Sequence, residues 1–247
     1  MRTTRIHVPA PLAAGLRVPL PDAAATHLVR VLRLKEGDAC VLFNGDGRDY
    51  PGRVASIGRR EVLVDVDDGV PVGNESPLRL TLLQGVARGE KMDWILQKAT
   101  ELGVAAVLPV DSERSGVRLE GARLQRRVAH WRGVLAAACE QCGRARVPSI
   151  EPPQPLEAAL SALEAPGRRL FLDPDGPLAV DGLALEDQLP LAAVLAIGPE
   201  GGWSPRDRGQ LAASGFEGLR LGPRILRTET AGLAAIAVLQ ARCGDLG

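Results

Sequence analysis

Hydrophobic and polar residues follow two different patterns along the chain. Short apolar runs and one helically spaced stretch fill the first part: they predict strands over 2–8, 39–43, 53–57 and 61–66, and a helix over 22–34. Asn44-Gly45 lies between the second and third of these strands, and both residues tolerate positive φ, which is typical of a hairpin turn. The first 70 or so residues therefore predict a small, strand-rich barrel.

After residue 77, apolar strands alternate with amphipathic helices. The predicted strands are 78–83, 104–110, 169–172, 191–197 and one near Leu219, and the predicted helices are 89–102, about 119–142, 156–163, one from Pro205 and one from Glu229. Because strands that are apolar on both sides alternate with helices, we expect a largely parallel sheet covered on both faces. Residues 69–77 combine Gly, Pro and polar residues and predict the linker.

Composition agrees with a folded globular chain of 247 residues, since 45% are hydrophobic and 24% are charged. Aromatic residues make up only 3%, too few for a sheet that stacks several RNA bases. The longest apolar run, 233–239, is much shorter than the roughly 20 residues of a membrane span. We expect a soluble cytoplasmic protein that is not embedded in a membrane.

The net charge is zero, but the charges are unevenly distributed. Residues 1–35 hold six cations and one acid, and residues 112–146 hold eight cations and three acids. Residues 36–68 and 147–199 are acidic in balance. Two basic blocks indicate either localised anion-binding faces or solvated helix faces, and charge alone does not separate these interpretations.

The cysteines and histidines do not indicate a metal site. Cys139 and Cys142 have the C-x-x-C spacing, but no second pair or neighbouring histidine pair completes a zinc site. Since both fall within a predicted helix, we interpret them as small, buried thiols. We expect no metal.

The loop after strand 191–197 is unusual because three glycines occur within five residues, directly before a helix. Such a loop lets a backbone approach a ligand closely, at the edge of the sheet where α/β proteins bind ligands. Its spacing matches neither the dinucleotide fingerprint nor the P-loop. Ser204 and Pro205 fit the N-cap and first helical position. Glu200, between glycines, is more than capping requires.

The loop at 221–227 precedes the last helix. Thr228 fits an N-cap, and Glu229 is a favourable acid for a first turn. Arg227 is not explained by capping, because a cation beside the positive end of a helix is disfavoured unless it has an anionic or planar partner. The helix that follows is poor in charge, so we expect it to be buried in this core or against a second subunit.

These loops and several other segments together resemble one family. The matching segments are IGPEGGWSP (197–205), LGPRILRTETA (221–231), EKMDWILQKATELGV (90–104), PVDSERS (109–115), EQCGRARVP (140–148) and HLVRVLRLKEGD (27–38). In this order they resemble the RsmE family, the 16S ribosomal RNA uridine-N3 methyltransferases of the SPOUT class. The departures are Trp203 in place of a more usual Phe, Cys142 in place of a small polar residue, and Asp207 in place of Glu.

The resemblance implies a PUA-like β-barrel over residues 1–72 and a SPOUT methyltransferase domain over 73–247. That domain would be an α/β fold with a parallel sheet flanked by helices, whose C-terminal part forms a trefoil knot, and the protein would be a homodimer. S-adenosyl-L-methionine would bind in the knot. By position, the implied cofactor-binding residues are Leu172, Ile197, Gly198, Pro199, Glu200, Gly201, Gly202, Leu221, Gly222, Ile225, Leu226, Arg227 and Thr230.

The substrate implied is 16S rRNA, either free or in the assembled small ribosomal subunit. Because the uracil N3 carries a weakly acidic proton, we hypothesise that Arg227 holds the uracil oxygens and stabilises negative charge, while Glu200 accepts or relays the proton. The expected RNA-binding residues are Arg2, Arg5, Arg30, Arg33, Arg114, Arg118, Arg126, Arg127 and Arg144.

Three alternatives stay open at this point. The protein could be a SPOUT enzyme that methylates another RNA position, such as a ribose 2'-oxygen. It could be a non-catalytic RNA-binding module, which the barrel alone would permit. It could also be a small-molecule enzyme with a parallel sheet, although no nucleotide fingerprint supports this.

Overall fold

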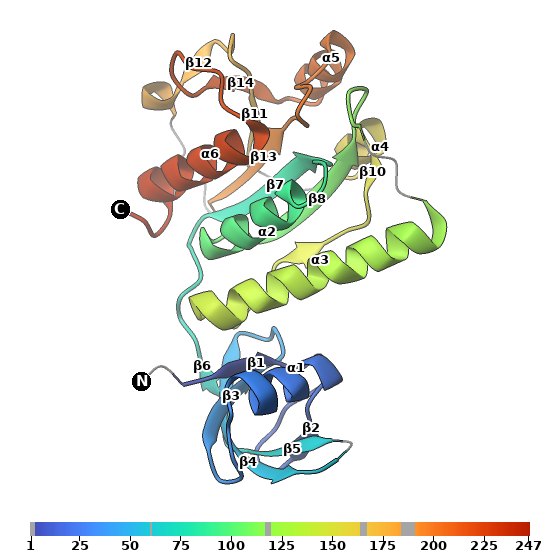
Figure 1. The fold of residues 1–247 in the computed structure, drawn as a ribbon. Helices are drawn as coiled ribbons and strands as arrows, with labels where there is room; N and C mark the ends of the chain where they lie inside the picture. The colour runs from blue at the N-terminus through green and yellow to red at the C-terminus, as the bar shows by residue number, and fades with distance from the viewer. Residues whose placement is uncertain (1–2, 60, 117–119, 164–166, 184–190) are drawn as a thin grey trace. The chain divides into compact units, whose positions relative to one another are not determined.

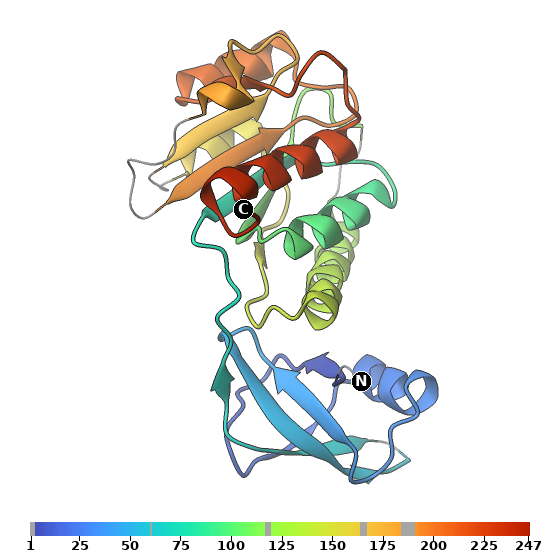
Figure 2. The ribbon, with the colours of Figure 1, turned by 90° about the vertical axis from the view of Figure 1, so that its left-hand side faces the viewer.

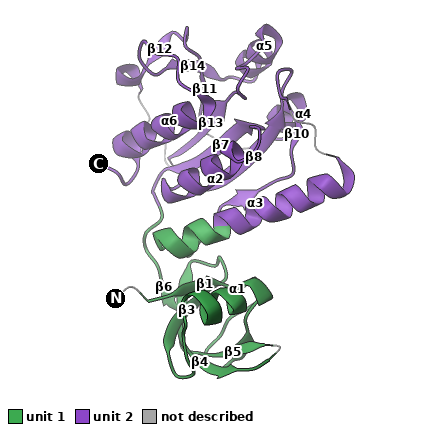
Figure 3. Cartoon of the chain, in the orientation of Figure 1, with its two compact units in different colours: residues 1–75, 136–147 green, residues 76–135, 148–247 purple. Residues whose placement is uncertain are grey.

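The computed structural model describes residues 3–59, 61–116, 120–163, 167–183 and 191–247. The chain divides into two compact units, drawn in different colours in Figure 3. Unit 1 contains residues 1–75 and 136–147, and unit 2 contains residues 76–135 and 148–247. Each unit has its own hydrophobic core.

Unit 1 is built on a six-stranded sheet. Its strands are β1 (Arg5–His7), β2 (Arg17–Pro19), β3 (Ala39–Phe43), β4 (Arg48–Ile57), β5 (Val62–Val66) and β6 (Val70–Pro71). The order is β1-β3-β4-β5-β2, with β6 paired to β4, and every pairing is antiparallel except β1 with β3. The predicted hairpin is confirmed: β3 and β4 pair across a turn in which Gly45 and Gly47 have positive φ.

The helix predicted over residues 22–34 is shorter and changes type. An α-helix, α1 (Asp22–Thr26), continues as a single π-helical turn, η1 (His27–Val31), in which the Leu32 N–H donates to the His27 carbonyl. Leu28 is fully buried, and Leu34 packs against the same core after the chain turns. Packing on the sheet thus overrides the regular helical spacing that the apolar pattern predicts.

Unit 2 contains an eight-stranded sheet. Its strands are β7 (Arg79–Gly85), β8 (Ala106–Asp111), β9 (Ser149–Ile150), β10 (Gln154–Pro155), β11 (Arg168–Leu172), β12 (Leu178–Ala179), β13 (Ala192–Ile197) and β14 (Glu217–Arg220). The order is β10-β8-β7-β13-β11-β14-β12, with β9 paired to β8. All pairings are parallel, which confirms the predicted parallel α/β sheet.

Helices cover both faces of this sheet. They are α2 (Lys91–Glu101), α3 (Gly121–Cys142), α4 (Leu156–Ser161), α5 (Pro205–Ala213) and α6 (Thr228–Cys243), with a short 3-10 helix at Val180–Gly182. Figures 1 and 2 show α2 and α6 side by side on one face. Residues of α4 and α5 pack with Leu83 and Val194 on the other face, whereas Ile197 faces α6, where a Cβ atom on Gly232 would lie 3.5 Å from it. Alternate side chains of each strand therefore enter opposite layers.

Candidate active site

Three neighbouring strands end at the same edge of the unit 2 sheet. Because β11 lies between β13 and β14 and all three are parallel, the chain leaves each of them on one side of the sheet. The glycine-rich loop after β13 leads to α5, and the loop after β14 leads to α6. The topology thus brings together the two loops that the sequence singled out, as expected for ligand sites in open α/β sheets.

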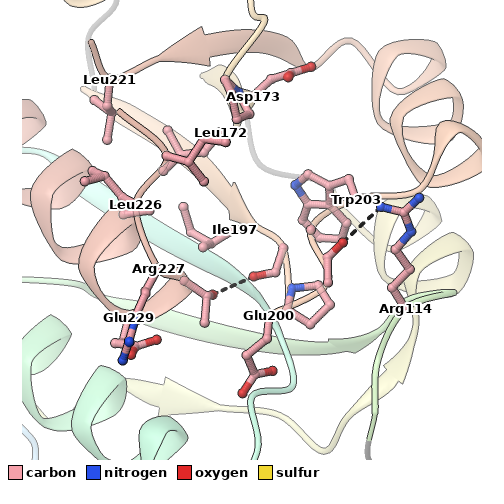
Figure 4. Close-up of a pocket in the computed structure, with 18 of the residues that line it drawn as sticks. Arg114, Leu172, Asp173, Ile197, Glu200, Trp203, Leu221, Leu226, Arg227 and Glu229 are labelled. Atoms are coloured by element: carbon pink, nitrogen blue, oxygen red, sulfur yellow. Dashed lines mark hydrogen bonds between the residues drawn. The ribbon is translucent and has the colours of Figure 1, made fainter. Parts of the chain in front are cut away.

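A cavity of about 510 Å³ lies between these loops (Figure 4). It is lined by every predicted cofactor-binding residue except Thr230, which is exposed on the first turn of α6. The remaining lining residues come from α2, α5, β14, α6 and the loops: Lys91, Arg114, Asp173, Pro174, Trp203, Arg208, Leu219, Arg224, Thr228, Glu229 and Ala231. Its size and its mixture of apolar and polar walls suit a small organic ligand.

The loop after β13 is closely folded around its glycines. A Cβ atom on Gly198 would lie 3.0 Å from the backbone carbonyl carbon of Gly202, and Gly202 itself has a φ of +66°. The next helix begins with Ser204 as its N-cap, as the sequence predicted, and Asp207 completes a capping box: the Asp207 N–H donates to Ser204 Oγ over 3.0 Å, and the Ser204 N–H donates to Asp207 Oδ2 over 2.9 Å. The loop therefore enters α5 in a fixed conformation.

The start of the last helix differs from the prediction. Arg227, not Thr228, occupies the N-cap position, and Thr228 is the first residue of α6. Instead of capping its own helix, the buried Thr228 hydroxyl donates to the Gly198 carbonyl over 2.6 Å, and Gln84 Nε2 donates to Thr228 Oγ1 over 3.3 Å. This hydroxyl joins the two cavity loops to each other and to β7.

Arg227 is exposed at the cavity wall. Its backbone carbonyl accepts hydrogen bonds from the first turn of α6, but within the described part of the chain its guanidinium has no hydrogen-bond acceptor or ion pair. In Figure 4, Arg227, Glu229 and Glu200 lie at one end of the cavity. A cation at the positive end of a helix, without an internal partner, is available to an anionic or planar ligand.

Glu200 is held by α2 and the residues before it. Its Oε1 accepts hydrogen bonds from the Arg88 N–H over 3.1 Å and from Lys91 Nζ over 3.2 Å. Partial desolvation raises the pKa of this carboxyl, but hydrogen bonds from the N–H groups of Glu200 and Arg88 and from Lys91 outweigh it, so the pKa is lowered. Glu200 is therefore an anion at neutral pH and a weak base.

Several residues at the cavity were not predicted as cofactor residues. Arg114, expected only to contact RNA, donates from Nη1 to the Gly201 carbonyl over 3.0 Å. Asp173 follows β11 and accepts a hydrogen bond from Arg208 over 2.8 Å. Lys91 lies on α2, and its Nζ donates a hydrogen bond to the Glu200 carboxylate over 3.2 Å. Asp173 could have been found from its place at a strand end, but the other contacts depend on tertiary structure.

The arginines predicted to bind RNA have different surroundings. Arg2 and Arg118 lie outside the described residues. Arg30, Arg33, Arg114 and Arg126 are exposed, and Arg127 is half-buried.

Two of these arginines, both in unit 1, are engaged internally. Arg5 forms an ion pair with Asp49, lies over the Phe43 ring and donates to a backbone carbonyl, and its side chain is 9% exposed. Arg144 forms two hydrogen bonds to the Glu75 carboxylate, at 3.1 and 2.6 Å, and its side chain is 6% exposed. These contacts give both arginines a structural role in unit 1.

The cysteine pair at the end of α3 is not oxidised. Cys139 is buried as predicted, whereas Cys142 is half-buried; the hydrogen bond with Cys142 and burial raise the pKa of the Cys139 thiol. Within the described ranges, no group of three metal-ligating side chains occurs. Among those same residues, none of the helices combines the length and apolar character needed to traverse a membrane.

Comparisons with known families agree with this arrangement of fold and site. Residues 74–240 match the family model of an RNA methyltransferase domain, and residues 20–67 match that of an RNA methyltransferase PUA domain. Together with the parallel sheet and the cavity at its edge, these matches define the class of the protein as an RNA methyltransferase with an N-terminal PUA domain.

Individual relatives narrow the class to one family. A ribosomal RNA small subunit methyltransferase E from Neisseria gonorrhoeae, solved with bound S-adenosyl methionine, is 36% identical with a TM-score of 0.90, and each chain is covered completely. A methyltransferase from Legionella pneumophila, solved with SAM, is 34% identical with a TM-score of 0.92 over the full length of both chains. The Bacillus subtilis methyltransferase E is 29% identical over 86% of this chain and 85% of its own. The chain belongs to the ribosomal RNA small subunit methyltransferase E (RsmE) family.

Proposed function

We propose that this protein transfers the methyl group of S-adenosyl-L-methionine to N3 of a specific uridine in 16S ribosomal RNA. The observation that carries the proposal is the cavity formed by the loops after β13 and β14, with the unpaired Arg227 at its wall. Relatives of this chain are named as small-subunit ribosomal RNA methyltransferases, and two were solved with this cofactor.

The cavity residues fit S-adenosyl-L-methionine. The closely folded backbone of 197–202 and the apolar side chains of Leu172, Ile197 and Leu226 would hold the adenosine part, because a loop of glycines leaves main-chain groups accessible to a base edge. The wall carries both acids, including Glu200, and cations, which suits a ligand that bears a sulfonium, an ammonium and a carboxylate group. When bound, the cofactor supplies a methyl group on a cationic sulfonium.

Arg227 and Glu200 are the proposed catalytic residues. Transfer forms the N3–CH₃ bond and breaks the bond from sulfur to the methyl carbon, and the N3 proton passes to Glu200 or to water. The Arg227 guanidinium would bind a uracil oxygen and stabilise the negative charge that develops when that proton leaves. The lowered pKa of Glu200 supports a role as a fixed anion that orients Lys91 and the loop, and its role as proton acceptor stays a prediction.

The RNA would be held through phosphates by exposed arginines. Arg30, Arg33, Arg114 and Arg126 are exposed cations in the two basic blocks, which suits sequence-independent binding of a folded RNA. The target base must leave its stack to reach a cavity.

We also propose residues 1–72 as the PUA-like RNA-binding domain and residues 73–247 as the methyltransferase domain, with a trefoil knot in its C-terminal part.

We also propose a cytoplasmic homodimer. The helix α6 carries apolar residues on all sides, and Leu233, Ala237 and Val238 are only half-buried. On the neighbouring α2, Trp94 is 52% exposed. A second copy would cover this surface. Light scattering coupled to gel filtration should give twice the chain mass, and a monomer at micromolar concentration would contradict the dimer.

The function is tested by incubating the protein with labelled S-adenosyl-L-methionine and 16S rRNA, either free or in small subunits that lack the modification. We expect label in one uridine, and digestion to nucleosides should yield 3-methyluridine. Label on a ribose 2'-oxygen would favour the other RNA methyltransferase reaction. Failure to bind the cofactor in a calorimetric titration would favour an RNA-binding module without catalysis.

A further inference from the structure

Two aliphatic side chains in unit 1 project into solvent beside exposed cations. Val31 is 64% exposed and Leu32 is 40% exposed, although both follow the buried Leu28. We call residues 27–35 the basic tip. In Figure 2 the helical segment that carries it stands to one side of the strands of unit 1.

The cations of the basic tip are not neutralised within the described part of the chain. Arg30, Arg33 and Lys35 are exposed, and no acidic side chain there pairs with them. The two acids that follow accept backbone hydrogen bonds and form no ion pair with these cations: Glu36 accepts the Ile57 N–H over 2.8 Å, and Asp38 accepts the Lys35 N–H over 2.7 Å. The basic tip is therefore a compact, net positive surface with an apolar centre.

The backbone of the basic tip is costly to form. Arg33 has a φ of +55°, and no other non-glycine residue in the described ranges has a positive φ. It follows Leu32, the C-cap of the π-helical turn η1, at a position where helices commonly use glycine because other residues are strained there. An arginine kept in this conformation suggests that its side chain has a function, since glycine would fold more easily.

We propose that the basic tip binds an unpaired, unstacked nucleotide of RNA. Val31 and Leu32 pack against the exposed face of the base or its ribose, while Arg30 and Arg33 contact the flanking phosphates. Single-stranded loops offer both groups, because their bases are splayed away from the stack and their phosphates stay accessible. The inference rests on the proposed function, for which it names the RNA feature that unit 1 binds.

Other occupants fit the basic tip less well. Two aliphatic side chains form too small an apolar area for a stable protein interface, which buries about 800 Å² on each partner. A membrane surface would need a longer amphipathic face than one helical turn. An RNA nucleotide matches both the apolar area and the charge.

The first test replaces Arg33 with glycine in the full-length protein. Arg33→Gly should unfold at the same temperature or a higher one, since glycine adopts the left-handed conformation without strain. Its affinity for a labelled RNA hairpin with an unpaired loop should fall, and the slope of log K against log salt should decrease by about 0.7, which corresponds to one lost phosphate contact with single-stranded RNA. Arg17→Gln is the matched control, because the charge of Arg17 is already paired with Asp65.

The second test removes the apolar centre. The double variant Val31→Ser/Leu32→Ser should bind the hairpin about tenfold more weakly, with an unchanged salt slope, and should bind a fully paired RNA duplex as the wild type does. Val70→Ser is the matched control, since Val70 is an exposed aliphatic residue of the same unit.

The outcomes separate this inference from the proposed function. Wild-type affinity of either basic-tip variant for the hairpin overturns the inference, and so does a wild-type protein that does not bind the hairpin. Variants that bind RNA normally but fail only on assembled subunits would indicate a protein partner and also overturn it. A wild-type protein that binds the hairpin without methylating any uridine would contradict the proposed function. The hairpin affinities of the wild type and the basic-tip variants would still decide whether the basic tip binds RNA.

Discussion

The Thr228 hydroxyl is the contact on which the cavity geometry depends most directly. It donates to the Gly198 carbonyl over 2.6 Å and accepts from Gln84 Nε2 over 3.3 Å, and Thr228 is only 8% exposed. Thr228→Val keeps the size and the β-branched shape of the side chain but removes the hydroxyl. We expect the loops after β13 and β14 to lose the bond that joins them.

The magnitude follows from the burial of the partners. Gly198 is buried, so its carbonyl would lose its hydrogen bond at a site with little access to water, and an unsatisfied buried acceptor costs about 1–3 kcal/mol. We expect the free energy of unfolding to fall by about this amount. Because the cofactor would also have to order the separated loops on binding, its affinity should fall about tenfold, since each tenfold change corresponds to about 1.4 kcal/mol.

Two assays measure these effects separately. Denaturant unfolding gives the free energy of unfolding, and calorimetric titration with S-adenosyl-L-methionine gives the affinity. Thr228→Ser is the matched control, because it keeps the hydroxyl and should stay close to wild type in both assays. If Thr228→Val bound the cofactor and unfolded as the wild type does, the hydroxyl would not hold the cavity loops together, and this reasoning would be refuted.

Three further predictions concern charged residues. Arg227→Ala should lower the methylation rate at least about a hundredfold, because the charge on the uracil would lose its stabilising cation. The affinity for the cofactor should stay within about threefold of wild type, because the guanidinium has no internal partner to lose. An unchanged single-turnover rate would exclude a catalytic role of Arg227. Glu200→Gln should remove stability that the wild type has above the ordinary glutamate pKa and loses as pH falls through the lowered pKa of Glu200. The free energies of unfolding of the two proteins should therefore converge in acid, and a difference that widens in acid would contradict this sign. Arg144→Gln should lower the free energy of unfolding by about 3 kcal/mol, because it leaves the Glu75 carboxylate without this partner. Arg17→Gln should lower it by less than about 1 kcal/mol, because the pair of Arg17 with Asp65 is exposed. Equal decreases for the two variants in urea unfolding would contradict the structural role of Arg144.

The unit 2 sheet could be predicted from the sequence because its strands are long and buried. The run 191–197 is apolar on both sides, as expected of a strand between two helical layers, and 78–83 is apolar apart from Arg79 and Thr81. The short strands β9, β10 and β12 were missed, since two-residue strands have no pattern of their own and exist only through pairing with a neighbour.

The candidate site could be predicted in its position but not in its internal contacts. Glycines after a buried strand indicate a loop that folds closely, and the rule for open α/β sheets places it at a ligand site. The hydrogen bond of the Thr228 hydroxyl could not be predicted, because local sequence favours a bond to its own helix. In the structure this hydroxyl bonds to another loop instead, because β13 brings the Gly198 carbonyl oxygen within 2.6 Å of Thr228 Oγ1.

Charge patterns have a similar limit, because they count cations without regard to burial. Arg5 and Arg30 contribute equally to the basic block at residues 1–35, yet the Arg5 side chain is 9% exposed and paired with Asp49, while Arg30 is exposed. A buried cation needs an acid nearby to offset its desolvation, so its charge is compensated before any RNA arrives. Long-range attraction of phosphates therefore falls to the exposed cations, and in the described part of that block those without an acidic partner are the ones in the basic tip, because Arg17 is paired with Asp65.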